Sequence, residues 1–239
     1  MSSDADKILS ELTVVGAERR RRAADPELGR RVIALKAYQQ LRFSHTYGDL
    51  LASDRYGPAA RFFLDELYGP SDFTRRDTQF ARVVPALVRL FPREIVQTVA
   101  TLSRLHALSE SLDTEMGSRL LSAPLDAEAY TIAWRATGRA TDREQQIALT
   151  LDVASMLDRL TRKALIRNSL RLMRGPARAA GLSELQLFLE AGFDTFRAMG
   201  GAEDFMRIVD EREHMLSGAL FMDSAAVAMP GLLPGRSAR

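Results

Sequence analysis

Apolar residues recur along most of the chain at intervals of three and four, which is the spacing of one face of an α-helix. The first such segment covers residues 4–24, where Ile8, Leu12 and Val15 share a face. The same spacing continues through 27–52, 59–68, 73–91, 92–121 and 126–137. No segment shows the alternation of apolar and polar residues that marks a half-buried strand, so the pattern predicts an all-α protein.

Proline and glycine mark where the predicted helices begin and end. Asp25 and Pro26 form an N-cap and first-turn pair, and Thr141 with Glu144 forms a capping box. That box begins the longest predicted helix, 141–174, and a second one at Ser183 begins a pair of helices over 183–199 and 202–216. We therefore expect a single-domain bundle of about eight helices around one long central helix, 141–174.

The chain divides into three predicted parts. Residues 1–25 form an N-terminal helix that ends in the solvated basic run Arg19 to Arg22, and residues 26–222 form the helical domain. Residues 223–239 are dominated by Ala, Gly, Pro and Arg, which predicts a disordered tail. Within 73–91, Pro85 predicts a kink because it lacks an N–H group and its ring crowds the preceding turn.

Composition excludes several classes of protein. No run approaches the roughly 18 consecutive apolar residues of a membrane span, and the polar, acidic start does not resemble a secretory signal. The chain has no cysteine, which excludes disulfides, thiolate metal ligands and a cysteine nucleophile. These features predict a cytoplasmic protein.

The strongest charge feature lies between residues 159 and 178, which contain seven basic residues and no acid although the net charge of the chain is only +2. We call these seven the basic stripe: Arg159, Arg162, Lys163, Arg167, Arg171, Arg174 and Arg178. On one helix, five of them would fall within about 120° of each other. Such a face suits an acidic protein partner or a phosphate-bearing ligand, and the alternative is a solvated face favoured by the helix dipole.

Nucleic acid is a less favoured partner for the basic stripe. The near-neutral net charge lacks the overall basic field of many nucleic-acid-binding proteins. Few aromatic residues are interleaved with the arginines to stack on bases.

Residues 61–69 combine two phenylalanines with a helical apolar face formed by Phe63, Leu64, Leu67 and Tyr68. The segment 62–68 resembles the signature of a bacterial family named for its FFLEELY motif, with Asp65 where the family has glutamate. The resemblance extends over about residues 56–213 and implies an all-helical fold. The family has no assigned activity, so no substrate, cofactor or site residue follows. Physically, the pattern predicts a core helix, with a partner-docking surface as the alternative.

His106 is the histidine that lies on the apolar side of a predicted helix, four residues after Leu102. With Gln79 on the preceding helix, its placement resembles a globin's distal glutamine and proximal histidine, and this gives an alternative function in which His106 ligates haem iron. Pro85 interrupts the would-be distal helix and the chain is much longer than a globin. The other interpretation is a buried, hydrogen-bonded histidine.

The remaining candidates for chemistry are incomplete. Glu211 and His214 form one E-x-x-H pair, whereas a di-iron bundle needs two such pairs and further carboxylates. His45 and Asp49 lie one turn apart on the same predicted helix. Such neighbours cannot by themselves arrange a nucleophile, a base and an orienting group as a catalytic triad requires. Phosphate-binding glycine loops and serine-hydrolase motifs are absent.

We therefore predict a non-enzymatic binding or adaptor protein without a cofactor or catalytic residues. Its basic stripe would engage a protein or an anionic ligand, and haem binding through His106 is the alternative. A phosphometabolite enzyme would need a deep pocket that collects the stripe together with carboxylates such as Asp65 or Asp77.

Overall fold

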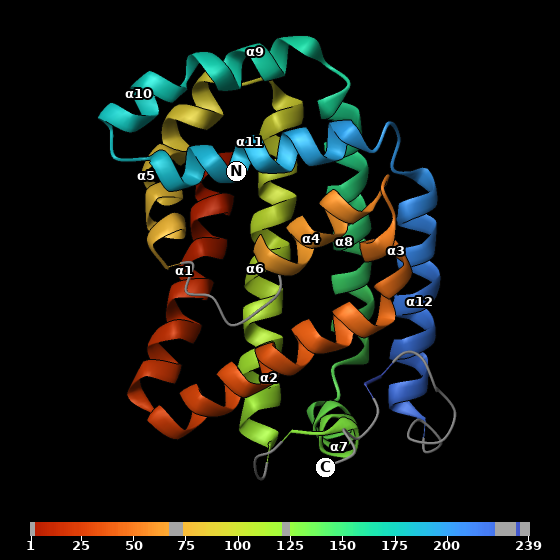
Figure 1. Ribbon diagram of the computed structural model, residues 1–239. Coiled ribbons are helices and arrows are strands. Elements are labelled where there is room, and N and C mark those ends of the chain that lie inside the picture. The colour runs from red at the N-terminus through yellow and green to blue at the C-terminus, as the bar shows by residue number, and fades with distance from the viewer. Residues whose placement is uncertain (1–2, 67–73, 121–124, 223–232, 235–239) are drawn as a thin grey trace.

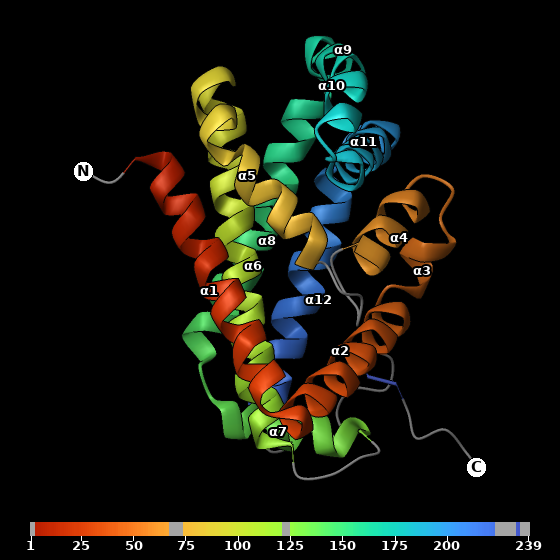
Figure 2. The ribbon, with the colours of Figure 1, turned by 90° about the vertical axis from the view of Figure 1, so that its left-hand side faces the viewer.

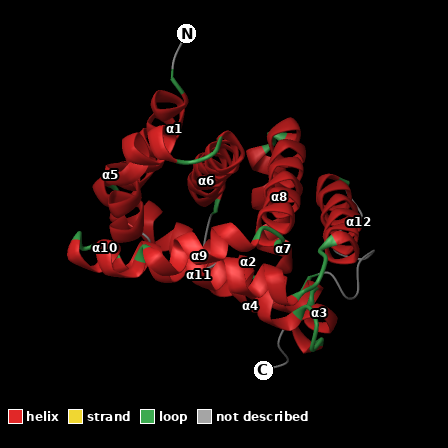
Figure 3. Cartoon of the chain, turned by 90° about the horizontal axis from the view of Figure 1, so that it is seen from above, coloured by secondary structure: helices red, strands yellow, loops and turns green. Residues whose placement is uncertain are grey.

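The computed structural model describes residues 3–66, 74–120, 125–222 and 233–234 (Figure 1). Ten helices of seven or more residues lie within these ranges, together with two shorter ones, and no strand is found there (Figure 3). The helices are α1 (Asp4–Ala24), α2 (Pro26–Thr46), α3 (Gly48–Ala52), α4 (Gly57–Glu66), α5 (Thr74–Leu90), α6 (Arg93–Arg119), α7 (Ala127–Thr137), α8 (Ala140–Thr161), α9 (Ala164–Leu172), α10 (Arg174–Ala179), α11 (Ser183–Ala198) and α12 (Glu203–Phe221). The predicted all-α single domain is confirmed, but the expected number of about eight helices is too low.

Four long helices, α1, α6, α8 and α12, stand side by side in one layer (Figures 1 and 3). Helices α2, α4 and α11 cross one face of this layer, with α2 toward one end and α11 toward the other (Figures 1 and 2). Helix α7 closes the end near α2, and α9 and α10 lie beyond α11 at the opposite end. Within the described residues, no helix is both long and apolar enough to cross a membrane.

The prediction of one central helix over residues 141–174 is wrong. Helix α8 ends at Thr161, and α9 and α10 follow as separate helices across the end of the bundle. Lys163 adopts an extended backbone between α8 and α9, and its ammonium group pairs with Glu94 at the start of α6. The central position belongs instead to α6, which has 27 residues and packs against α1, α2, α7 and α8.

Helix starts follow the sequence signals at some positions and depart from them at others. The Asp25 carboxylate accepts hydrogen bonds from the backbone N–H groups of Glu27 and Leu28, which confirms the predicted N-cap of α2. At α8 the predicted Thr141 cap is not formed, because the helix begins one residue earlier after Arg139, whose φ is positive. The predicted helix 27–52 is divided at Tyr47 into α2 and α3.

The aromatic motif of α4 is a core element. Phe63 is buried between Phe196 and Phe205, with ring centroids 5.7 and 5.9 Å away, and Phe62 is buried beside Phe188 at 5.5 Å. These contacts join α4 to α11 and α12. The motif residues 67 and 68 lie outside the described residues.

Described residues near both ends of the chain contact the bundle. Arg19 and Arg22 of α1 are partly buried and pair with Asp77 and Glu110, so the predicted solvated run is wrong at these two positions. At the other end, Leu233 is buried in the cluster that also contains Leu35, Tyr38, Met116 and Leu220. The rest of the predicted tail 223–239 lies outside the described residues.

Candidate functional site

A cavity of about 220 Å³ lies between the α6–α8–α12 layer and the helices that cross it. More than half of the side chains that line it are apolar. The charged and amide groups that line it are Lys36, Gln39, Arg42, Arg76, Asp77, Glu110, Asp113, Arg143, Gln146 and Glu213, together with His106. Charged groups in a mostly apolar cavity are unusual, because burial of charge costs solvation free energy.

Most of the charged groups that line the cavity gather toward the end near α7, whereas Arg76 lies over the Phe188 ring of α11 at the other end. Helices α6 and α12 run toward α7, and α8 runs away from it (Figure 1). The halves of these helices nearest α7 supply Glu110, Asp113, Arg143, Gln146 and Glu213. The halves nearest α11 supply Val99, Leu102, Leu151, Ala154, Phe205 and Met206. A molecule in the cavity therefore meets most of the charge near α7, while apolar side chains line both ends.

Glu110 lies where α1, α2 and α6 meet. Lys36 Nζ donates to Glu110 Oε1 at 2.7 Å, and Arg22 Nη2 donates to Glu110 Oε2 at 2.5 Å. The same Lys36 Nζ is 3.8 Å from Asp113 Oδ2, while Gln39 Nε2 donates to Asp113 Oδ1 at 3.0 Å. The three-residue spacing on each helix places Glu110 and Asp113 opposite Lys36 and Gln39. These five residues form what we call the Glu110 cluster.

The two carboxylates of this cluster have opposite pKa shifts. Burial alone would raise the pKa of Glu110, but the charges of Lys36 and Arg22 outweigh burial and lower it to about 2. For Asp113, burial dominates and raises the pKa, and the neighbouring Glu110 charge adds to this effect. The polar end thus holds one firmly ionised acceptor beside a carboxyl group that takes up a proton more readily.

A second charged contact joins α2 to α12. Arg42 and the Tyr47 hydroxyl both donate to Glu213 Oε1, the latter at 2.7 Å. Arg42 and Tyr47 are buried. Glu213 is thereby held at the edge of the cavity.

Arg143 supplies a cation that is held against an aromatic ring. Its guanidinium carbon lies 3.9 Å from the centroid of the Trp134 ring, within the range of a cation–π contact. Its Nη1 donates to Gln146 Oε1 at 3.0 Å, and Gln146 Nε2 in turn donates to Ser109 Oγ at 2.8 Å. This chain of contacts fixes Arg143, which is buried, at the polar end of the cavity.

His106 lines the cavity one turn before Glu110 and is partly buried. Its Nε2 lies 2.9 Å from Asp77 Oδ2, which also accepts from Arg19 Nη2 at 2.7 Å. Burial would raise the pKa of Asp77, but His106 and Arg19 lower it. The Asp77 carboxylate therefore accepts from both groups. A haem-iron bond through Nε2, as in the alternative function, would require His106 to leave Asp77.

The basic stripe does not form one helical face, because the chain turns between α8 and α9. Arg159 is in α8, Arg162 and Lys163 lie at the turn, and the other four are divided between α9 and α10. None of the seven is among the described residues that line the cavity, and Asp65 is exposed elsewhere. The deep pocket required for a phosphometabolite enzyme collects Asp77 but no residue of the stripe.

Four residues of the basic stripe form ion pairs with acids that belong to α6, α8 and α11. Arg162 pairs with Asp158, Lys163 with Glu94, Arg167 with Asp194 and Arg174 with Glu190. Arg159, Arg171 and Arg178 have no ion pair within the part of the chain that the structure describes. The stripe is thus partly neutralised by acids of α6, α8 and α11.

The other candidate groups are separated. Glu211 pairs with Arg207, whereas His214 faces Asp210 and Glu144. Asp49 pairs with Arg212 and has a lowered pKa, caused mainly by that hydrogen bond. Among the described residues, no group of three His, Asp or Glu side chains is arranged to hold a metal ion.

A family model named "Domain of unknown function (DUF8198)" matches residues 18–227. The chain belongs to this family. The matched region of this DUF8198 chain begins within α1 and includes every charged side chain that lines the cavity. No curated protein and no solved structure gives a significant match. The comparisons therefore supply a family but no ligand, partner or activity.

Sequence reasoning identified His106 but missed Glu110, Asp113, Lys36 and Arg143. A signal was present, because His106, Glu110 and Asp113 are spaced by four and three residues and therefore share one face of α6. Apolar residues such as Ala107 and Leu112 occupy neighbouring positions. Acids on the same face as a core stripe indicate buried charge, and that pattern predicts a site more directly than exposed arginines do.

Proposed function

We propose that this chain is a helical binding protein that holds a small amphipathic molecule in its central cavity. The observation that carries the proposal is the gathering of buried charged groups toward one end of a mostly apolar cavity. An apolar body would lie beside Phe63, Ala154 and Phe205. A polar group would reach the Glu110 cluster and Arg143.

The energetic cost of the charged end supports this proposal. Replacing a buried ion pair by packed apolar residues is often neutral or stabilising, so stability does not account for the Glu110 cluster. Glu110 is only 4% exposed, and its neighbours come from three helices. Charged groups collected in this way inside an apolar cavity are typical of a binding site.

The size of the cavity limits the ligand. A cavity needs about 10–15 Å³ on this measure to hold one water, so the cavity exceeds the space of one or two waters. It is smaller than the pockets of about 300–1,000 Å³ that enclose drug-sized ligands. We therefore propose a compact ligand, with one apolar group and one hydrogen-bonding head group.

The resemblance to the FFLEELY-motif family stays a proposal and is compatible with this function, because Phe63 of that segment lines the cavity. The adaptor function suggested by the basic stripe is a second candidate. It concerns a different surface from the cavity, because none of the seven residues of the stripe lines the cavity.

The cavity can be tested with 2-naphthol, a compact fluorescent probe that has an aromatic body and one hydrogen-bonding group. We expect saturable binding of the probe to the full chain. The variant Ala154→Phe fills the end of the cavity nearer α11, because Ala154 is buried and lines the cavity. It should weaken binding roughly tenfold, since a ring occupies the space that the probe needs. Fluorescence titration measures the affinity.

A matched control is Ala148→Phe, which makes the same change on an exposed position of the same helix. This control should bind the probe as the parent chain does. Circular dichroism checks that both variants fold, and Ala154→Leu replaces the larger substitution if Ala154→Phe does not. Unchanged affinity in a folded, cavity-filled variant would reject the proposed site.

A further inference from the structure

The outer face of α9 exposes two leucines at the end of the bundle. Leu165 and Leu172 are 80% and 79% exposed, and Met173 beside them is 43% exposed. Because seven residues make almost two full helical turns, Leu165 and Leu172 project from the same side of α9. Ile166 and Leu170 are more buried and occupy another side of the helix. The two leucines are therefore not needed to attach α9 to the bundle.

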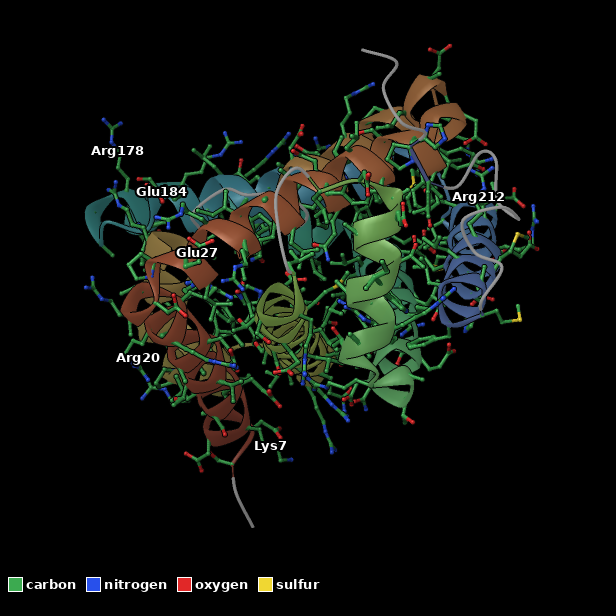
Figure 4. The ribbon with its side chains drawn as sticks, turned by 90° about the horizontal axis from the view of Figure 1, so that it is seen from below. Lys7, Arg20, Glu27, Arg178, Glu184 and Arg212 are labelled. Atoms are coloured by element: carbon green, nitrogen blue, oxygen red, sulfur yellow. The ribbon has the colours of Figure 1, made fainter. Side chains whose placement is uncertain are left out.

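The segment that carries these leucines is rich in cations and contains no acid. Residues 159–178 contain seven basic side chains and no Asp or Glu. The acids that pair with four of them belong to the C-terminal part of α8 and to α6 and α11. Arg171 and Arg178 are exposed and outside those pairs, and Figure 4 shows Arg178 projecting away from the ribbon. The outer surface thus combines apolar and positive groups.

The shape of this surface favours a bilayer over a protein partner. The leucines stand on an exposed helix at the edge of the molecule (Figure 2). The small pocket between α9 and α11 is lined by neither Leu165 nor Leu172, so the two leucines stand outside it. A lipid surface needs no groove, because leucines enter between acyl chains while arginines meet phosphate groups. Nucleic acid would use the arginines but leave the leucines in water.

We propose that the outer face of α9, together with the exposed Arg171 and Arg178, binds the surface of an anionic lipid bilayer. The chain would lie on the membrane with α9 and α10 against the head groups. This proposal is independent of the cavity, since none of these residues is among those that line it.

Vesicle co-sedimentation of the full chain tests the proposal. One set of vesicles contains phosphatidylcholine alone, and the other contains roughly one-quarter phosphatidylglycerol as the anionic lipid. We expect binding to the anionic vesicles only. Binding should decrease several-fold as salt rises toward about 0.15 M, where charges on a surface are screened beyond about 8 Å.

Two pairs of substitutions separate the apolar and charged contributions. Leu165→Gln with Leu172→Gln should lower the fraction bound roughly tenfold, because the inserting groups are lost. Arg171→Gln with Arg178→Gln should weaken binding several-fold and reduce its salt dependence. The matched control is Ile33→Gln with Leu41→Gln on α2, whose side chains are 58% and 55% exposed. This control should bind as the parent chain does, and so should Ala154→Phe.

Three outcomes would overturn the proposal. One is the absence of binding to anionic vesicles, and another is equal binding by the leucine variant. The third is binding of a synthetic acidic amphipathic peptide, measured by fluorescence anisotropy, that depends on Leu165 and Leu172 while vesicles are not bound. That result would assign the face to an acidic protein segment.

Discussion

Glu110 and Asp113 lie three positions apart on α6 but differ in their surroundings. Glu110 accepts hydrogen bonds from two cations, Lys36 and Arg22, and its pKa is lowered to about 2. Asp113 accepts a hydrogen bond from the Gln39 amide, and the Lys36 ammonium group lies farther from it. Burial raises the pKa of Asp113. The balance between burial and the number of close cations therefore decides which carboxyl group stays ionised.

We predict that Glu110→Gln destabilises the protein by on the order of 3 kcal/mol at neutral pH. The folded-state pKa of Glu110 is below its ordinary value of 4.5. The contribution of the ionised Glu110 to the free energy of unfolding is therefore fully present above about pH 4.5. It is lost as the pH falls toward 2. The difference in unfolding free energy between parent and variant should therefore shrink over this range. Urea unfolding at several pH values measures it.

Asp113→Asn is the matched comparison for that experiment. Since the pKa of Asp113 is raised in the folded state, ionisation of Asp113 opposes folding. Asp113→Asn should lower the free energy of unfolding by less than Glu110→Gln does at neutral pH. The loss caused by Asp113→Asn should not grow as the pH rises. A larger loss for Asp113→Asn than for Glu110→Gln would contradict the assigned roles.

At the scale of elements, the crossing of α2 over α6 depends on a residue without a side chain. A Cβ atom added at Gly117 of α6 would overlap with Cγ2 of Val32 on α2. Val32 and Leu28 are buried at this contact. Glycine therefore sets how closely the two helices that carry the Glu110 cluster approach.

We predict that Gly117→Ala destabilises the fold by about 1–3 kcal/mol, because overlap in a packed core outweighs the better helix propensity of alanine. Gly218→Ala on α12 is the control, since no atom lies within 4 Å of the added Cβ. That variant should gain up to about 1 kcal/mol from propensity alone. Thermal unfolding of both variants measures the two shifts, and shifts of the same sign would disprove the packing argument.

At the scale of the whole molecule, the described C-terminal residues return to the bundle. Leu233 is buried with Leu35, Met116 and Leu220, which belong to α2, α6 and α12. These helices also form the cavity. The contact therefore helps to hold together the layers that enclose the candidate site.

We predict that Leu233→Ala lowers the unfolding free energy by about 2 kcal/mol, the lower range for removing a buried leucine side chain. Met222→Ala is the control, because Met222 is 60% exposed and should change stability by less than about 0.5 kcal/mol. Chemical unfolding compares the two. Equal, small effects would mean that Leu233 does not contribute to the core in solution.

The sequence by itself determined those features that depend on neighbouring residues. Helical periodicity identified the all-α class, and Asp25 with Pro26 fixed the start of α2 because a cap acts within one turn. It also identified Phe63 as a core residue, since a helix with one broad apolar face must bury that face. These signals are local, so they are readable without the fold.

Only the tertiary structure decided where the chain turns and where charge is buried. The break after Thr161 has no proline or glycine within it, and Lys163 there pairs with Glu94 from another helix. Glu110 meets Arg22, which lies 88 positions away, and the cavity exists only because the helices of two layers leave space between them. Such contacts depend on how helices cross, and helical periodicity carries no information about crossing partners.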